Sequence, residues 1–174
     1  MNMFILSTCQ KHAAQMHADK HVVKMPLETA QLLCTAHVVL DGANPSLYKA
    51  THINHPCSIW VRKTECNYIW TFMLFRELAK EYTHRYGKTH LSWTKLQHPL
   101  AALPENIPAG GLTPFAQAMP EELRCDDAVE AYRNYYNTSK SHLHWWTKRE
   151  IPEWITTERP AFEDMSLLQK LAYL

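Results

Sequence analysis

The chain has 174 residues, of which 46% are apolar and 20% charged, a length and composition that fit one folded domain and exclude wholesale disorder. Its 18 lysines and arginines nearly balance 17 aspartates and glutamates, so the net charge of +1 excludes polyanion binding by bulk charge but leaves local basic patches open. With 4 glycines it contains no GxGxxG or GxxxxGKS/T phosphate loop, whereas 11 histidines, 6 tryptophans and 8 tyrosines favour a planar, polar ligand.

The first forty residues predict helix. Residues 3–6 form a short apolar run, and a helix capped by Ser7 or Thr8 is expected to begin near Cys9. Apolar residues then recur at helical spacing as far as position 40. Pro26 interrupts this stretch, so either one helix kinks there or a second helix begins at this proline.

The middle of the chain carries the clearest helical pattern. Residues 55–61 begin with a His-Pro pair and predict a short helix. A long helix is predicted from about Glu65 to Tyr86, with Thr64 as its N-cap and Gly87 as its C-terminal cap. One apolar stripe at a spacing of three to four residues supports it: Tyr68, Phe72, Phe75, Ala79, Tyr82 and Tyr86.

The last third of the chain mixes loop and helix. Residues 98–120 hold five prolines and the Gly110-Gly111 pair, which predicts an irregular, Pro-rich loop that is functional or draped over the fold. Asp126 and Asp127 predict the start of another helix, and residues 161–174 are expected to form a terminal one. Because no strand pattern is strong, the predicted architecture is a single all-α domain over residues 1–174.

Cysteine usage and hydropathy indicate the compartment. The five cysteines form no CxxC pair, and their odd number is typical of a reducing compartment rather than a disulfide framework. The chain begins with no basic segment followed by a long apolar run, and no stretch approaches ~18 consecutive apolar residues. We therefore expect a soluble protein without a membrane partner, located in the cytoplasm, which is the host cytoplasm if a phage encodes the chain.

A polar ridge is the first candidate for chemistry. If residues 17–28 are helical, His17, His21, Lys24 and Glu28 share one face, with Lys20 beside them. One interpretation is a solvated helix face in which Lys24 and Glu28 form an i,i+4 ion pair. The other is a site whose histidines and lysines meet a phosphate or a sugar.

Two further histidines raise the possibility of a metal. His52 and His55 stand in the sequence HINHP, and together with His17 and His21 they amount to four imidazoles. HxxxH on a helix projects both rings from one face, which suits zinc. A zinc-dependent hydrolase is therefore one alternative, and it requires that the two pairs converge; without that convergence we expect no metal and no cofactor.

Aromatic residues interleaved with basic ones mark the C-terminal third. Arg133, Tyr135, Tyr136 and Lys140 are of the types that bind nucleic acids or nucleotides, since aromatic rings stack on bases and cations hold phosphate. By contrast, the charged residues near the end of the long helix are interpreted as its solvated polar face: Glu77, Glu81, His84, Arg85, Lys88 and His90.

Several stretches resemble known proteins. The sequences HADKHVVKMPLETAQLL, ATHINHPCSIWV, EYTHRYGKTH, QAMPEE and AYRNYY are similar to those of small uncharacterised proteins common in tailed phages and large viruses. More distantly, three blocks in the same order resemble the pyrimidine-dimer DNA glycosylases of the phage endonuclease V type: KHVVKMPLETAQLL, the segment from NHPCSIWVR to THRYGK, and the C-terminal Tyr-Arg-x-Tyr-Tyr. The second block contains Arg62.

The resemblance implies a compact all-α fold with the N-terminus near the site. In those enzymes the N-terminal amine, on a small second residue, forms a Schiff base with the damaged nucleoside. Here residue 2 is Asn, so we expect Met1 to be retained and its amine to be displaced by one residue. The position of the family's catalytic glutamate holds Lys24, and Glu28 follows one turn later. Lys24 is an alternative amine, because lysines also perform Schiff-base chemistry.

These observations give one leading hypothesis and a second alternative. The leading hypothesis is a DNA glycosylase/lyase acting through an imine, with Lys24 or the Met1 amine as nucleophile and Glu28 handling protons. Its partner would be DNA or a nucleotide, bound by His17, Lys20, His21, His52, His55, Arg62, Arg133, Tyr135, Tyr136 and Lys140. The alternative is a non-enzymatic protein of the same fold that sequesters a small or cyclic nucleotide in phage counter-defence.

Overall fold

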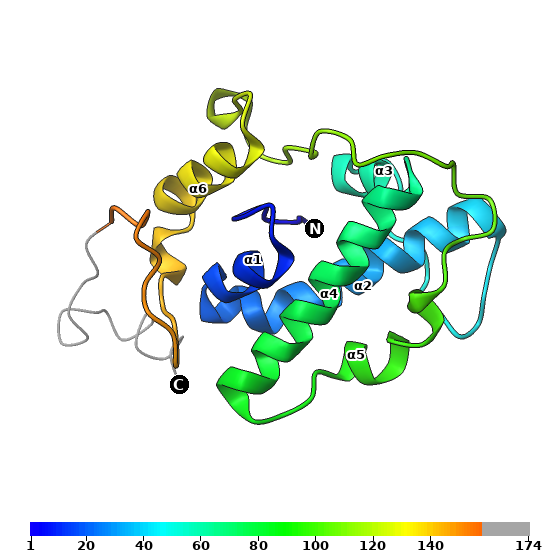
Figure 1. Ribbon diagram of the computed structural model, residues 1–174, viewed down its shortest axis with the longest axis horizontal. Helices are drawn as coiled ribbons and strands as arrows, with labels where there is room; N and C mark the ends of the chain where they lie inside the picture. Colours follow the sequence, from blue (N-terminus) through cyan, green and yellow to red (C-terminus); the bar gives the residue numbers. More distant parts are fainter. Residues whose placement is uncertain (158–174) are drawn as a thin grey trace.

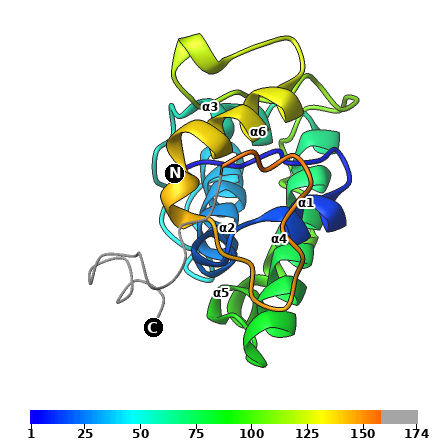
Figure 2. The same cartoon turned by 90° about the vertical axis from the view of Figure 1, so that its left-hand side faces the viewer.

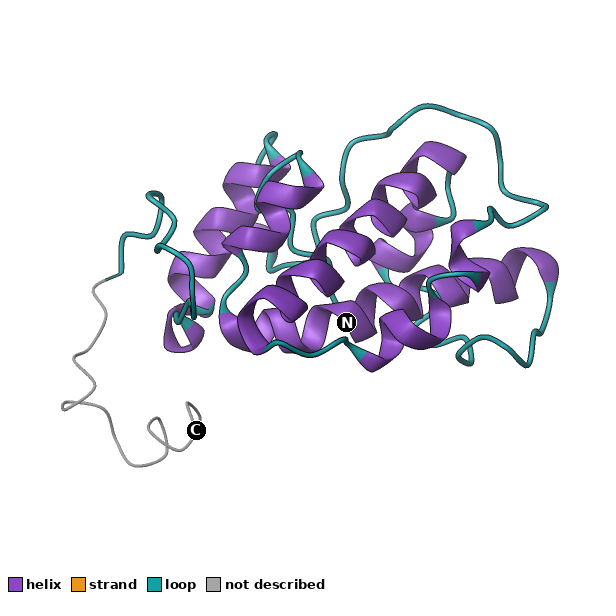
Figure 3. Cartoon of the chain, turned by 60° about the horizontal axis from the view of Figure 1, so that its bottom comes forward, coloured by secondary structure: helices purple, strands orange, loops and turns teal. Residues whose placement is uncertain are grey.

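The structure, a computed structural model, describes residues 1–157, which contain helices and no strand (Figure 3). The prediction of an all-α fold is thereby confirmed for this part of the chain, while the helix predicted over residues 161–174 lies outside the described residues. The helices are α1 (Gln10–Met16), α2 (Asp19–Asp41), α3 (Pro56–Val61), α4 (Glu65–Tyr86), α5 (Leu91–Leu96) and α6 (Ala128–Ser139), with short 3₁₀ turns η1 (Pro99–Ala101), η2 (Glu121–Leu123) and η3 (Ser141–Leu143).

The two long helices, α2 and α4, cross each other at the centre of the molecule, and α1 packs against α4 (Figure 1). The predicted caps of α4 are confirmed: the Thr64 hydroxyl accepts a hydrogen bond from the Asn67 amide at 3.2 Å, and Gly87 ends the helix at a φ of 67°. Within residues 1–157 no helix has both the length and the apolar character that crossing a membrane requires.

The break between the first two helices differs from the prediction. Pro26 lies inside α2, and the chain instead leaves the helical conformation at His17 and Ala18. The break occurs there because Asp19 is held by distant groups. Its backbone amide donates to the Trp145 carbonyl at 2.8 Å, and its carboxylate accepts from the amide and hydroxyl of Thr147.

The N-terminal apolar run forms part of the core although it is neither helix nor strand. Residues 3–6 are buried, and they pass between α4 and α6 (Figures 1 and 2). Met3 receives a contact from the Thr71 hydroxyl of α4, while the Phe4 ring packs against Tyr132 and Tyr136 of α6. The start of the chain is consequently clamped from both sides.

The predicted Pro-rich loop is irregular and drapes over the ends of α3 and α4. Side chains of the helices satisfy its backbone: Trp60 Nε1 donates to the Pro114 carbonyl at 2.7 Å, and the Thr64 hydroxyl donates to the Gly111 carbonyl at 3.0 Å. Gly110 passes so close to Thr64 that an added Cβ would lie 2.9 Å from its methyl group. The loop then returns to the N-terminus through Ala118.

Candidate functional site

The side chain of Asn2 fixes the first residues in place. Its amide nitrogen donates to the Ala118 carbonyl at 2.9 Å, and its oxygen accepts from the Tyr132 hydroxyl at 3.1 Å and from the Met3 amide at 2.7 Å. Tyr132 is fully buried, so this anchor is rigid. Met1, which precedes it, is only half-buried.

Glu28 of α2 joins the chain start to a lysine. One carboxylate oxygen accepts from the Asn2 backbone nitrogen at 2.9 Å, and the other forms an ion pair with Lys24 Nζ at 3.0 Å. Glu28 is 8% exposed, whereas the Lys24 side chain is 65% exposed. The carboxylate is therefore buried beside the chain start, whereas the lysine reaches the molecular surface.

The loop before α3 carries two of the predicted site residues, His52 and His55. Burial, followed by the positive charge of the N-terminal amine and by His52, lowers the pKa of His55, while Glu28 acts in the opposite direction. Helix α3, which this loop precedes, contacts the chain start, since Cys57 Sγ lies 3.8 Å from Asn2 Oδ1 and Ser58 Oγ lies 3.9 Å from Met1 Sδ. The structure thus places Met1, Lys24 and Glu28 at the chain start beside α3, while His52 and His55 lie in the loop that precedes this helix.

Arg62 stabilises the loop before α3 through a hydrogen bond to its backbone. It donates to the Ile53 carbonyl at 2.8 Å, and burial lowers its pKa. His52 in the same loop has a φ of 49°, a left-handed conformation that non-glycine residues rarely adopt. Arg62 thereby stabilises the turn that carries His52 and His55, while its predicted contact with a ligand stays a prediction.

The C-terminal end of α6 contributes a lysine, Lys140, and an aromatic ring, Tyr135. Lys140 Nζ lies 4.9 Å from the centre of the half-buried Tyr135 ring, and that ring stacks on Phe4 with centroids 6.1 Å apart. Burial, followed by the charges of His17, Lys140 and Lys24, lowers the pKa of His21. Lys20 is exposed on α2, one turn before Lys24.

Three predicted ligand contacts lie in the interior instead. His17 and Tyr136 are completely buried and His21 is nearly so. His17 Nδ1 bonds to the Ala13 carbonyl at 2.6 Å, and His21 Nδ1 hydrogen-bonds to the Tyr136 hydroxyl. The prediction that they contact a phosphate or sugar is wrong for this structure, because the break at residues 17–18 and the Phe4 ring enclose them.

Arg133 contacts two other segments of the chain. Its Nε donates to the Leu6 carbonyl at 3.1 Å, and its guanidinium lies 5.3 Å from the centre of the Trp154 ring. The side chain therefore connects the N-terminal run to the C-terminal segment. These contacts give Arg133 a structural role, and its predicted contact with a nucleic acid or nucleotide stays a prediction.

The zinc alternative lacks its ligand geometry. In residues 1–157 no three histidine, cysteine, aspartate or glutamate side chains are grouped to hold a metal ion. His17 and His21 belong to the aromatic core, with ring centroids 6.3 Å apart in an edge-to-face arrangement, whereas His52 is at the surface. The two histidine pairs therefore do not converge.

Asn2 and Tyr132 anchor the chain start at the candidate site, a role that the sequence pattern did not predict for either residue. The available signal was a polar residue inside an otherwise apolar run, Met-Asn-Met-Phe-Ile-Leu. Comparison of the chain with protein-family models, with curated proteins and with solved structures finds no match.

Proposed function

We propose that this chain acts on DNA or on a nucleotide, and that it cleaves an N-glycosyl bond through an imine formed at the N-terminal site. One observation carries the proposal: the Glu28 carboxylate contacts both the Asn2 nitrogen, at 2.9 Å, and Lys24 Nζ, at 3.0 Å. Imine chemistry needs an amine next to a group that moves protons. This carboxylate contacts the amine of Lys24 directly, and it bonds the backbone nitrogen of Asn2, the residue that follows the Met1 amine.

The reaction balances with these groups. Glu28 takes a proton from the amine, whose nitrogen then bonds to the sugar C1′ as the C1′–N bond to the base breaks. Glu28 gives this proton to the leaving base, and the sugar ring opens as a proton passes from the alkylated nitrogen to the ring oxygen, which gives a protonated imine between the amine and C1′. Water hydrolyses the imine, which returns the free amine and leaves an abasic sugar.

The side chains around the N-terminal site are of the types that bind a nucleic-acid strand. Lys20, Lys24 and Lys140 offer positive charge for phosphates, and the Tyr135 ring offers a surface on which a base can stack. Since a base inside a duplex is out of reach, a duplex substrate would need its target nucleotide flipped outward.

Borohydride trapping on DNA with an abasic site tests the proposal. We expect a covalent adduct whose digestion maps the modified nitrogen to Met1 or to Lys24. Glu28→Gln should reduce adduct formation about 100-fold, the usual size of a lost acid–base step. Glu122→Gln, at an exposed glutamate of η2, is the matched control and should leave it unchanged. Absence of an adduct with the wild-type protein contradicts the imine mechanism.

A second candidate function is nucleotide sequestration without chemistry. Its supporting observation is that the nitrogen bonded to Glu28 is the Asn2 backbone amide, which is not a nucleophile. A small or cyclic nucleotide would then bind between Lys24, Lys140 and Tyr135. A large thermal shift with such a nucleotide, with no product and no borohydride adduct, would favour this function over the enzyme.

A further inference from the structure

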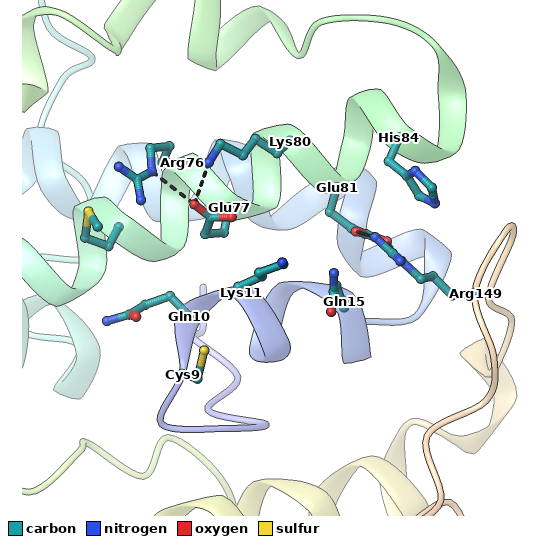
Figure 4. Close-up of a pocket in the computed structure, with 11 residues that line it drawn as sticks. Cys9, Gln10, Lys11, Gln15, Arg76, Glu77, Lys80, Glu81, His84 and Arg149 are labelled. Carbon is teal, nitrogen blue, oxygen red and sulfur yellow. Dashed lines mark hydrogen bonds and ion pairs between the residues drawn. The ribbon is translucent and has the colours of Figure 1, made fainter.

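A second cleft lies between α1 and α4 and shares no lining residue with the N-terminal site. Its volume is about 530 Å³, within the ~300–1,000 Å³ typical of small-molecule pockets. Figure 4 shows its two walls, with Lys11 and Gln15 pointing from α1 toward the side chains of α4. The proposed reaction uses none of these residues.

The cleft carries an excess of positive charge. Four of its lining side chains are lysine or arginine (Lys11, Arg76, Lys80 and Arg149) and two are glutamate, Glu77 and Glu81. The two-charge excess is concentrated here although the whole chain has a net charge of only +1. Cations that line a concave surface attract anionic ligands more strongly than the same charges spread over a convex one.

The two glutamates hold the arginines and one lysine in fixed positions. One oxygen of Glu77 accepts from Arg76 Nε at 3.0 Å and from Lys80 Nζ at 2.8 Å. Glu81 is 3% exposed and grips Arg149 through Nε at 3.0 Å and Nη2 at 2.8 Å. Among the described residues these bonds leave the terminal nitrogens of Arg76 and one of Arg149 for a ligand, so the donors are preorganised.

Lys11 shows that the positive charge of the cleft is not fully neutralised by its own glutamates. It is exposed, and none of the ion pairs among residues 1–157 includes it. It nevertheless points into the same space as the paired cations (Figure 4). Its charge is therefore available to a ligand.

The spacing of the cations selects the ligand. Glu77 holds Arg76 and Lys80, and Glu81, one turn later on the same face of α4, holds Arg149, so the two groups of donors are separated by about 6 Å at ~1.5 Å per residue. A single phosphate group is too small to meet both groups of donors, whereas two linked phosphate groups can. We infer that the cleft binds a small anion with two or more linked phosphate groups, whose oxygens match the fork of donors on arginine.

The thiol of Cys9 provides a built-in reporter. Cys9 is exposed and lines the cleft, whereas Cys125 is exposed outside it. We measure the rate of alkylation of each thiol in the full chain with inorganic pyrophosphate as the probe. At about ten times the dissociation constant, pyrophosphate should slow modification of Cys9 about tenfold and leave Cys125 unchanged, because only the unoccupied fraction reacts.

Two variants make the test specific. Lys11→Gln should remove most of the protection of Cys9, and Lys63→Gln, at an exposed lysine outside the cleft, should retain it. Lys11 is exposed, so its replacement leaves the fold intact. Equal protection in the Lys11→Gln variant, equal slowing at Cys125, or protection by single-stranded DNA but not by pyrophosphate would each overturn the inference. None of these readouts depends on imine formation.

Discussion

At the scale of single residues, two histidines are notable because they titrate far from their ordinary range. Burial lowers the pKa of His17 to about 4 and that of His21 to about 2, with the charge of His17 also acting on His21. Both rings are therefore neutral inside the core at pH 7. They contribute packing against Phe4 and Tyr136, and not positive charge for a phosphate.

This burial predicts acid sensitivity. In the unfolded chain these histidines take up protons below about pH 6.5, while the folded protein does not protonate them until about pH 4 or lower. The unfolded state then binds more protons, so stability falls as pH falls from 6.5 toward 4. Between pH 7 and pH 5 we expect a loss of about 2 kcal/mol per buried ring in urea denaturation.

The contribution of one ring can be isolated. The slope of the unfolding free energy against pH reports how many protons the chain takes up when it unfolds. His17→Gln should lower this number by about one, since glutamine does not titrate. His12→Gln, at an exposed histidine of α1, is the matched control and should retain the wild-type dependence. An unchanged pH dependence in the His17→Gln variant would contradict the assignment.

At the scale of elements, the end of α4 depends on one backbone conformation. Gly87 has a φ of 67° and accepts the left-handed cap without a Cβ penalty. We expect Gly87→Ala to lower the free energy of unfolding by about 1 kcal/mol, because an L-residue is strained there. Gly111→Ala, at a position with open space and without a positive φ, should change it by less than about 0.5 kcal/mol. The urea concentration at the unfolding midpoint measures the stability of both variants. Equal midpoints would contradict the strain expected at Gly87.

At the scale of the whole molecule, a chain of ion pairs ties distant segments together. Arg85 of α4, whose side chain is completely buried, pairs with Asp19 at 2.6 Å and with Glu81 at 2.7 Å. Glu81 in turn binds Arg149 of the C-terminal segment at 2.8 Å. Burial alone would raise the pKa of Glu81, but the hydrogen bonds and charges of Arg149 and Arg85 lower it, so it stays ionised.

Removal of the Glu81 carboxylate should lower the free energy of unfolding. We expect Glu81→Gln to destabilise the fold by about 3 kcal/mol, because a buried arginine loses one of its two partners. Glu77→Gln breaks a pair of surface contacts on the same helix and should cost less than about 1 kcal/mol. The two variants are compared by denaturant unfolding, and similar losses would show that the network is not the link between these segments.

Local signals explain which helices were predictable. The stripe, the N-cap and the glycine of α4 lie within a few residues of one another, and the predicted bounds, Glu65 to Tyr86, are those observed. Likewise Asp127 accepts from the amides of Val129 and Glu130 at the start of α6. Such caps act on their own helix, so no knowledge of distant segments is needed.

The sequence by itself determined the all-α fold found over residues 1–157 and the position of α3, α4 and α6, and it offered the Lys24–Glu28 ion pair as one of two interpretations of the polar ridge. Only the tertiary structure decided that the polar ridge is divided: Glu28 turns toward Asn2, which lies 26 residues away, while His21 turns toward Tyr136 across a separation of 115 residues. Helical periodicity states which residues share a face, but not which distant segment covers that face. Burial of His17 and His21 follows from the passage of residues 3–6 between α4 and α6, a long-range arrangement without a local sequence pattern.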